Sequence, residues 1–334
     1  MSNRVAVIGT GIMGADHARI VVEDLPGAVL QVVCDVSGER ARAVAEECGA
    51  VDVATDPFAV IARSDVDAVL IASPDDTHAK LSIAAIQADK PVLCEKPLAL
   101  TTSDCLNVIQ AEKNAGRRMI QVGFMRRFDP SYTKMKADIE SGVVGQPIMM
   151  HNFHRNVKAP AGFTGSMSIT NSASHEFDVA RFVLNTEYST ISAFQPEIIE
   201  SDQCTAQVFL VLETTARHLV NVEVNNNATY GYDVRSELVG EKGSVFLNAP
   251  NHGRINTALT AIEHYPADWR PRFAEAYRLQ NKSWLEFVDT GEPSPIAASA
   301  WDGYCATAVA EAGVKALTEG RKIAIDLVEK PSLY

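Results

Sequence analysis

The chain lacks several features that would place it in a specialised class of protein. Among its 334 residues, no apolar run approaches the ~20 residues that a helix needs to cross a bilayer. The six cysteines form no C-x-x-C pair and no cluster with histidine at zinc spacing, and we expect no metal site. Internal repeats and low-complexity linkers are absent as well. These absences argue against a membrane span, a zinc domain and a repeat array.

An excess of positive charge is also lacking. The chain has 30 basic and 42 acidic residues, a formal net charge of −12, and the basic residues are scattered. We therefore expect neither nucleic acid nor a membrane as a partner. The sequence passes from Met1 into an apolar stretch at Val5 without the apolar core of a signal peptide. Together with cysteines that lie in apolar stretches, this predicts a cytoplasmic protein.

The length and the apolar fraction of 46% predict a globular protein of two domains. In the first part of the chain, short runs rich in Val and Ile alternate with amphipathic segments. The runs expected to be strands are 5–8, 29–34, 68–72, 91–94 and 119–124, and the clearest helices are 37–48 and 103–115. Repeated strand–helix–strand units of this kind predict an α/β domain over residues 1–122, with a doubly wound parallel sheet.

The pattern changes beyond this domain. We expect helices at 130–141 and 172–184, a loop at 157–170, and strands at 147–155, 206–213, 218–225 and 234–247, the last broken by a turn at 240–243. Strands in series with short turns predict an α+β domain over 123–334 with a large open, mostly antiparallel sheet. Two terminal helices, 271–289 and 299–318, are expected to pack on this sheet. They are too few to cover it, so an apolar face is left for a partner.

Residues 9–14 form a glycine-rich turn between a strand and a helix. The spacing is G-x-G-x-x-G at Gly9, Gly11 and Gly14, which is typical of the phosphate loop of a Rossmann fold. Asp35 ends the next strand, 21 residues after Gly14, where a carboxylate binds the adenosine ribose. Because that carboxylate would repel a 2′-phosphate, we expect NAD rather than NADP. Arg40 lies nearby and could reduce this repulsion.

Two further loops follow strands at the same edge of the sheet. One runs from Ser73 to His78 and the other contains Glu95 and Lys96. Ligands of doubly wound sheets bind beyond the carboxyl ends of the strands. Lys96 is therefore expected near the nicotinamide, and a surface salt bridge with Glu95 is the less favoured interpretation. For His78, capping of the following helix is as well supported as contact with the cofactor.

The segment 171–178 carries a candidate acid–base group. Asn171 and His175 are four residues apart and Asp178 is a further three along, so we expect all three to share one helix face. A histidine near a helix start that faces a cleft is a plausible general base. Taken alone the pattern is weak, since a lone helical histidine is more often an ordinary polar residue with satisfied hydrogen bonds.

Several longer motifs extend over the whole chain. They are CEKPLAL (94–100), QVGFMRRFDPSY (121–132), HNFHRN (151–156), SHEFDVARFVL (174–184), YGYDVRSELVGEKG (230–243), DWRPRFAEAY (268–277) and AWDGY (300–304). In these motifs the chain resembles the glucose–fructose oxidoreductase/inositol dehydrogenase/rhizopine-catabolism (Gfo/Idh/MocA) oxidoreductases, and most of all the bacterial NAD-dependent inositol 2-dehydrogenases.

The resemblance implies a role for each matching residue. Lys96 would hydrogen-bond the reacting hydroxyl and the nicotinamide ribose, Pro97 would follow a cis peptide bond, and His175 would accept the hydroxyl proton. The residues expected to bind NAD are Gly9, Gly11, Ile12, Met13, Gly14, Asp35, Ser73, Pro74, Thr77, His78, Glu95, Lys96 and Met125. Those expected to bind the substrate are Lys96, Arg126, Asn156, Asn171, His175 and Tyr232.

One position departs from the family pattern. Inositol dehydrogenases of this kind usually carry Asp four residues before the histidine, and this chain has Asn171. The resemblance implies oxidation of a ring hydroxyl of myo- or scyllo-inositol, with the chain assembled as a homotetramer through its open sheet. Two alternatives stay open: an aldose or pyranose dehydrogenase acting on a glucose-like sugar, and an NAD-binding regulator without catalysis. The presence of both Lys96 and His175 argues against the regulator.

Overall fold

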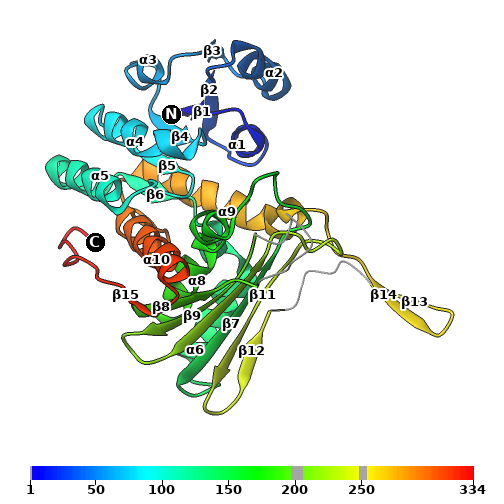
Figure 1. The fold of residues 1–334 in the computed structure, drawn as a ribbon. Coiled ribbons are helices and arrows are strands. Elements are labelled where there is room, and N and C mark those ends of the chain that lie inside the picture. Colours follow the sequence, from blue (N-terminus) through cyan, green and yellow to red (C-terminus); the bar gives the residue numbers. More distant parts are fainter. Residues whose placement is uncertain (1, 197–205, 248–253) are drawn as a thin grey trace. The chain divides into compact units, whose positions relative to one another are not determined.

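A computed structural model describes residues 2–196, 206–247 and 254–334 (Figure 1). The chain forms two compact units. The first consists of Met1–Phe128, Glu275–Thr307 and Val328–Tyr334, and the second of Asp129–Ala274 and Ala308–Leu327. This division differs from the expected domains, 1–122 and 123–334, because the chain returns to the first unit after residue 274. Cys204 lies outside the described residues.

A six-stranded parallel sheet forms the centre of the first unit, with the strand order β3-β2-β1-β4-β5-β6. The strands are β1 (Asn3–Ile8), β2 (Ala28–Cys34), β3 (Asp52–Ala54), β4 (Ala68–Ile71), β5 (Val92–Cys94) and β6 (Ile120–Val122). The predicted doubly wound parallel sheet is confirmed. β3 was not expected, because its three residues include an acid and form no apolar run.

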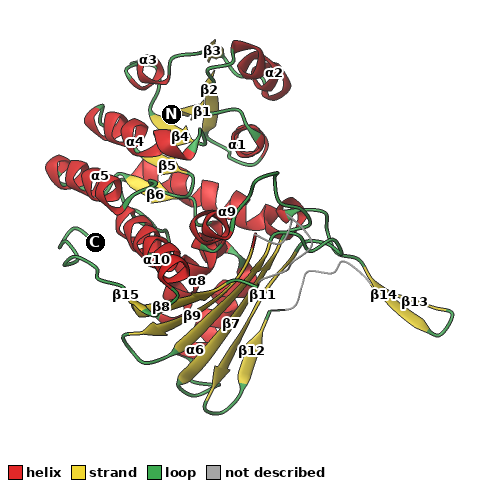
Figure 2. Ribbon diagram, in the orientation of Figure 1, coloured by secondary structure: helices red, strands yellow, loops and turns green. Residues whose placement is uncertain are grey.

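Helices lie on both sides of this sheet (Figure 2). They are α1 (Ile12–Glu23), α2 (Gly38–Cys48), α3 (Pro57–Ile61), α4 (His78–Gln87) and α5 (Thr102–Ala115), with 3₁₀ turns η1 (Asp75–Thr77) and η2 (Met125–Phe128). α1 contacts α2, and α4 contacts α3 and α5. Because both faces are covered, Val5, Ala6 and Val7 of β1 are all 0% exposed. This explains why the strands show no polar–apolar alternation.

The terminal helices α9 (Trp269–Thr290) and α10 (Ala300–Glu319) agree closely with their expected ranges. The expectation that both pack on the second sheet is corrected. Trp284 and Phe287 of α9 are buried in the core of the first unit with Val7 and Leu93, so the boundary between the units falls inside α9. Large apolar side chains on this half of α9 complete the core of the first sheet. No helix within the described ranges is both long and apolar enough to cross a membrane.

A seven-stranded sheet forms the centre of the second unit, in the order β12-β11-β7-β10-β9-β8-β15 (Figure 1). The strands are β7 (Pro147–Arg155), β8 (Tyr188–Phe194), β9 (Gln207–Thr214), β10 (Leu219–Asn225), β11 (Asp233–Gly240), β12 (Ser244–Phe246) and β15 (Ile323–Ala324). Only β7 and β10 pair in parallel, and the other pairs are antiparallel. This confirms the expected large, mostly antiparallel sheet.

Strand β8 and a separate hairpin, β13 (Arg254–Thr257) with β14 (Thr260–Glu263), were not expected. β8 reads YSTISAF, in which small polar residues obscure the apolar positions. All eight hairpin residues are exposed, so they carry no core pattern that a sequence would reveal.

The helices of the second unit include α6 (Pro130–Glu140), the short α7 (Gly165–Met167) and α8 (Ser174–Leu184). α8 contacts both α6 and β7. It begins two residues later than expected, because Ala173 N donates to Ser168 O, an i→i+5 bond that makes η3 (Ser168–Ser172) a π-helical turn. Asn171 therefore lies outside α8. The assumption that Asn171 and His175 share the face of one regular α-helix is corrected.

Candidate functional site

The loop between β1 and α1 can be built only with glycine at two positions. Gly9 has φ +96°, and a Cβ there would lie 2.4 Å from Ala72 O. A Cβ at Gly14 would lie 1.9 Å from Gly9 O. At Gly11, by contrast, a Cβ would meet nothing within 4 Å. Gly9 thus allows the tight turn and Gly14 allows the helix to pack closely on it, whereas Gly11 leaves the backbone open to a ligand.

The N-terminus of α1 has the properties of an anion site. Its N-cap Gly11 provides no side-chain cap, and its first turn contains no acid. The first backbone N–H groups of the helix therefore remain available to a negatively charged group. Ile12, which begins the helix, is 63% exposed, and Met13 next to it is half-buried. Together with the open backbone at Gly11, this arrangement fits the pyrophosphate of a dinucleotide.

Asp35 ties the glycine loop to the loop after β2. One carboxylate oxygen accepts from Thr10 N at 2.9 Å and Thr10 Oγ1 at 2.7 Å. The other accepts from Ser37 N at 2.8 Å and Arg40 Nη2 at 2.7 Å. Burial raises the pKa of Asp35, but these donors outweigh it and lower the pKa to about 2. The group is therefore an ionised acceptor at neutral pH, as a ribose-binding acid requires.

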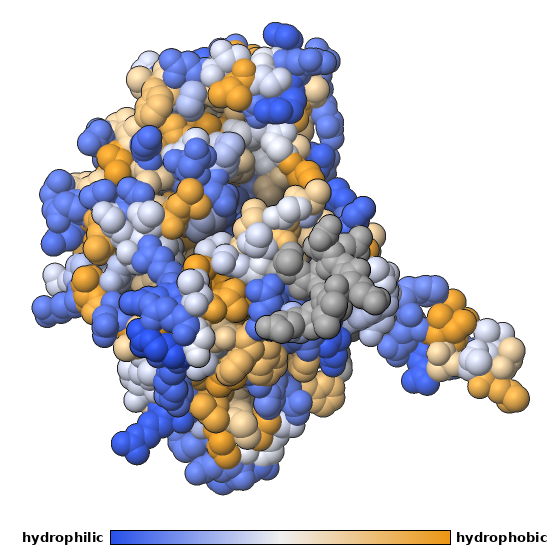
Figure 3. Space-filling model, in the orientation of Figure 1, coloured by the Kyte–Doolittle hydropathy of each residue, from blue (hydrophilic) through white to orange (hydrophobic). Residues whose placement is uncertain are grey.

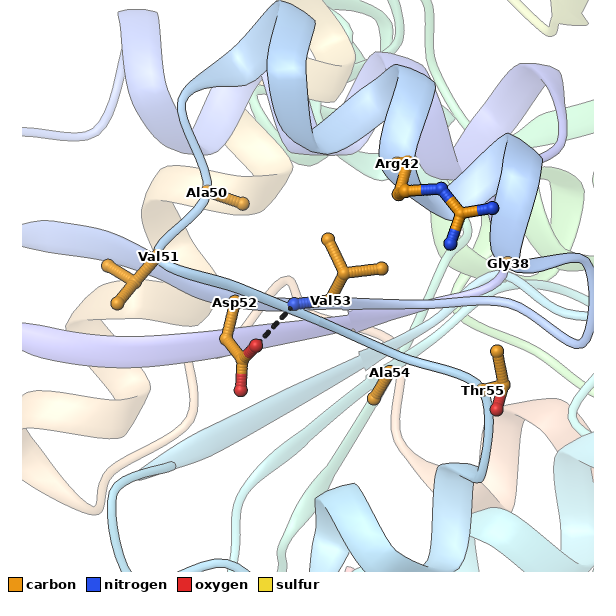
Figure 4. Close-up of a pocket in the computed structure, with 8 residues that line it drawn as sticks. All are labelled: Gly38, Arg42, Ala50, Val51, Asp52, Val53, Ala54 and Thr55. Carbon is orange, nitrogen blue, oxygen red and sulfur yellow. Dashed lines mark hydrogen bonds between the residues drawn. The ribbon is translucent and has the colours of Figure 1, made fainter.

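A hollow of about 410 Å³ lies between α2 and β3, beside this loop (Figure 4). Arg42 directs its guanidinium toward Gly38. A Cβ built on Gly38 would lie 3.6 Å from Nη1 of Arg42 and 3.3 Å from Cγ2 of Thr55. A second guanidinium thus lies close to the loop that holds Asp35, in addition to that of Arg40. These two positive charges reduce the negative potential expected around Asp35.

The loop after β4 is held by its own side chains. Ser73 Oγ lies 2.6 Å from Thr77 Oγ1, which donates to Pro74 O at 2.7 Å. His78 is 1% exposed, with Nδ1 2.7 Å from Pro97 O and Nε2 2.9 Å from Ser73 O. Burial lowers the pKa of His78, but Cys94 and the two carbonyl oxygens raise it to about 10. His78 thus joins two loops through their backbones and does not cap α4, so the capping interpretation is corrected. Contact of His78 with the cofactor stays a prediction.

Glu95 has partners other than the neighbouring lysine side chain. Its Oε1 lies 2.9 Å from Nε2 of the fully buried His17, and its Oε2 accepts from the backbone N of Lys96 at 3.2 Å. Asn281 Nδ2 lies 2.8 Å from His17 Nδ1. A Cβ at Gly123 would lie 2.9 Å from the Glu95 carboxyl, so this close packing requires glycine there.

Lys96 is half-buried and follows Glu95 at the end of β5. Within the described part of the chain, its ammonium has no hydrogen bond or ion pair, since the carboxylate next to it is occupied by His17. The Lys96–Pro97 peptide bond is cis, as the resemblance implied. The salt-bridge interpretation of this segment therefore has no support in the structure, and a positive charge at the ligand edge of the sheet is left for a ligand.

Met125 and Arg126 begin the turn η2 and are 2% and 1% exposed. The next residue, Arg127, forms an ion pair with Asp302 at 2.9 Å. These contacts fix the turn that follows β6. Lys96, Met125 and Arg126 belong to the first unit, whereas Asn156, Asn171, His175 and Tyr232 belong to the second.

His175 is the second residue of α8 and is 8% exposed. Every residue of α8 is buried, so the sequence of this helix is fixed by packing on all sides. Asn171, in the π turn before it, is exposed, and its backbone O accepts from Ser174 Oγ at 2.7 Å. The contact between the Asn171 amide and His175 stays a prediction.

Asn156 lies at the end of β7, beside a buried hydrogen-bonded pair of side chains. His154 Nδ1 lies 2.9 Å from Glu176 Oε2, and these residues are 5% and 1% exposed. Asn156 Nδ2 lies 3.2 Å from His154 Nε2 and 2.6 Å from Asn226 Oδ1. Tyr232 contacts the His154 ring edge to face, with the ring centroids 6.5 Å apart. Two expected substrate residues thus surround His154.

Sequence reasoning missed His17, Asn281, His154, Glu176 and Asn226. For His154 a signal existed: β7 alternates, and Met150, Asn152 and His154 all point to its buried face. No comparable signal links Asn281 to His17, because the two are far apart in the sequence. In the described ranges, no three His, Cys, Asp or Glu side chains gather as metal ligands.

Comparison with known proteins agrees with this geometry. A family model described as "Oxidoreductase family, NAD-binding Rossmann fold" matches residues 3–124, and the model of the Gfo/Idh/MocA C-terminal domain matches residues 132–246. Inositol 2-dehydrogenase 1 of Saccharopolyspora erythraea is 46% identical over 100% of this chain and 99% of its own length. Inositol 2-dehydrogenase of Streptomyces avermitilis is 40% identical over 99% of this chain and 96% of its own.

A solved structure is similar over the whole chain. The crystal structure of myo-inositol dehydrogenase from Lactobacillus casei in complex with NAD(H) and myo-inositol is 30% identical, with a TM-score of 0.94 and 100% of both chains covered. The glycine loop, the uncapped α1 and Asp35 have the donors and the acceptor that would suit the phosphates and the ribose of a dinucleotide. From these matches and this loop, the chain belongs to the Gfo/Idh/MocA family of NAD-dependent oxidoreductases.

Proposed function

We propose that the protein oxidises a secondary ring hydroxyl of a cyclic polyol, myo- or scyllo-inositol, to the ketone. The observation that carries this proposal is the ammonium of Lys96, which follows a buried strand at the ligand edge of the sheet and lacks a partner among the described residues. The names of the relatives support an inositol as the substrate.

Each residue has a distinct part in the proposed reaction. His175 accepts the proton of the substrate hydroxyl, and the Lys96 ammonium stabilises the negative charge that develops on that oxygen. The C–H bond of the same carbon breaks with its electron pair, leaving the C=O group of the product. NAD, when bound, supplies the nicotinamide C4 that accepts this hydride. The ring is oriented by Arg126, Asn156, Asn171 and Tyr232. Because the last three belong to the second unit, that unit is the substrate-binding domain in this proposal.

The substrate is tested by initial rates of NAD reduction with a panel of inositol isomers and aldoses. We expect the highest kcat/KM with an inositol. A higher kcat/KM with a glucose-like sugar would replace the inositol by an aldose. An absence of turnover with every polyol and sugar, at saturating NAD, would favour an NAD-binding regulator.

The choice of cofactor depends on Asp35. Its ionised carboxylate repels a 2′-phosphate, whereas Arg40 and Arg42 attract one. We therefore expect a moderate preference for NAD over NADP, at least about tenfold in kcat/KM, or roughly 1.4 kcal/mol. The measurement compares both cofactors at one saturating polyol concentration. Equal rates with NADP would contradict the role of Asp35, and Arg40→Ala should increase the preference.

The amide of Asn171 is predicted to tune the base. A carboxylate within ~4–6 Å of a histidine favours its protonated form and raises its pKa. Asn171→Asp should therefore shift the acid limb of the pH profile of kcat/KM to higher pH, and should increase turnover of myo-inositol relative to the best substrate. Asn171→Ala is the control that removes the amide without adding charge. If the limb does not move in Asn171→Asp, the side chain of residue 171 does not face His175.

The open sheet of the second unit is the proposed surface for assembly into a homotetramer. Large apolar side chains on its strands are exposed: Ile148 43%, Phe194 56%, Phe209 42%, Leu219 44% and Phe246 64%. Figure 3 shows apolar residues on the surface of these strands, next to polar ones. Sedimentation of the intact protein measures the oligomeric state.

Buried thiols at the five described cysteines are consistent with a proposed cytoplasmic location.

A further inference from the structure

A chain of hydrogen bonds in the second unit connects α8 to the turn before it by way of Asn156. Its members, here called the Asn156 network, are Glu176, His154, Asn156, Asn226 and Ser168. Four of them are almost completely buried: His154 5%, Glu176 1%, Asn226 2% and Ser168 0% exposed. Asn156 is half-buried and is the one member with a substantial accessible surface. Buried polar groups must be satisfied, so the direction of each bond can be worked out.

The first end of the network is a backbone carbonyl, which can only accept. Ser168 Oγ donates to Ala206 O at 2.5 Å, which uses the hydroxyl proton. Ser168 Oγ must then accept from Asn226 Nδ2, 2.8 Å away. This turns Asn226 Oδ1 toward Asn156, whose Nδ2 donates to it at 2.6 Å.

The other end is the Glu176 carboxylate, which accepts when ionised. His154 Nδ1 lies 3.0 Å and 2.9 Å from its two oxygens, so Nδ1 carries the proton. His154 Nε2 is then an acceptor, and the second N–H of Asn156 donates to it across 3.2 Å. Both ends therefore lead to the same orientation of Asn156. Its Nδ2 has both hydrogens committed, and Oδ1 is the Asn156 side-chain atom left without a partner among the described residues.

We propose that the Asn156 network determines which substrate group can bind at Asn156: a hydrogen-bond donor, such as a hydroxyl, and not an acceptor such as a keto oxygen or a fluorine. Glu176 and His154 are positioning residues, since they act through Asn156. This proposal rests on the proposed function in one respect, namely that Asn156 contacts the polyol. An acceptor placed against Oδ1 would leave two lone pairs facing each other in a partly buried site.

The proposal predicts that loss of Glu176 changes KM much more than kcat. In Glu176→Leu, His154 loses the acceptor that fixes its tautomer, so the amide of Asn156 is held from the Asn226 end alone and less firmly. We expect KM for the best polyol to rise about tenfold, with kcat changed by less than about threefold and NAD affinity unchanged. Glu176→Gln keeps an oxygen acceptor for His154 and is the matched control; its KM should stay within about twofold of wild type. If the leucine variant keeps the wild-type KM, or the glutamine variant shows the same defect, the positioning role is overturned.

Substrate analogues test the donor requirement directly. The probes are the monodeoxy-monofluoro analogues of the best polyol, in which fluorine replaces one hydroxyl and cannot donate. At one ring position, other than the reacting carbon, we expect a loss of about tenfold or more in kcat/KM that shrinks in Glu176→Leu. Uniform losses at all positions, or an unchanged loss in the variant, would refute the proposal.

A measurement without substrate separates this inference from the proposed function. Nitrogen-15 NMR of the protein labelled at histidine, with His154→Gln for assignment, reports which ring nitrogen carries hydrogen. We expect the Nδ1–H tautomer of His154 at neutral pH. An Nε2–H tautomer would overturn the network even if polyols are oxidised. If His154 is the Nδ1–H tautomer but the protein oxidises no polyol, the hydrogen-bond network stands and the proposed function is rejected.

Discussion

Replacing Lys96 by alanine is expected to lower kcat by about 10²-fold or more, while the affinity for NAD persists. The reason lies in the position of its ammonium. It follows β5 at the edge of the sheet where ligands bind, and the neighbouring carboxylate is held by His17 and by the Lys96 backbone N. The ammonium is therefore available to a developing alkoxide, and its removal destabilises the transition state more than the complex with NAD.

Initial rates at saturating NAD and polyol measure this loss, and titration of NAD followed by protein fluorescence measures cofactor affinity. Lys80→Ala is the matched control, because Lys80 is an exposed lysine of the same unit on α4. It should leave kcat within about twofold of wild type. If the Lys96→Ala variant turns over near the wild-type rate, Lys96 has no part in the reaction and is an ordinary lysine near the surface. Loss of NAD binding together with turnover would instead point to a structural defect.

The parts of the first unit that the sequence predicted are those set by local rules. The glycine loop is one example, since Gly9 and Gly14 meet backbone atoms that exclude any Cβ. Asp35 is another, because the length of a strand–helix–strand unit fixes its distance from the loop. The partner of Glu95 could not be predicted in this way. His17 of α1 reaches Glu95, and Asn281 of α9 in turn reaches His17. Only the tertiary fold brings these two helices together.

The second unit was harder to predict, for a different physical reason. A turn with one extra residue changes which side chains share a face, and the π turn Ser168–Ser172 does this directly before α8. Counting residues at i,i+4 or heptad spacing assumes a regular α-helix and therefore does not detect such a turn. The pairing of His154 with Glu176 has the same character, since it depends on α8 packing against β7. Sequence spacing thus singled out His175, and the family resemblance singled out Asn156, but neither revealed the buried groups around them.

The largest loss is expected for His175. As the proposed base, it accepts the proton of the reacting hydroxyl, and a positioned base contributes about 10²–10⁴-fold to such a step. His175→Ala should therefore reduce kcat by that factor with any substrate, and the acid limb of the pH profile of kcat/KM should disappear with it. Rates measured from pH 5 to 10 in wild type and variant test both statements.

His154 is the competing candidate for the base, and the geometry argues against it. Its Nδ1 faces Glu176 and its Nε2 faces Asn156, so both ring nitrogens already have partners. His264→Ala, at an exposed histidine of the second unit, is the control and should keep wild-type rates and pH dependence. If His175→Ala retains more than about a fifth of wild-type kcat with its acid limb in place, the proton goes to another group. Thermal unfolding of each variant verifies that a lost rate reflects lost chemistry, since α8 is buried along its whole length.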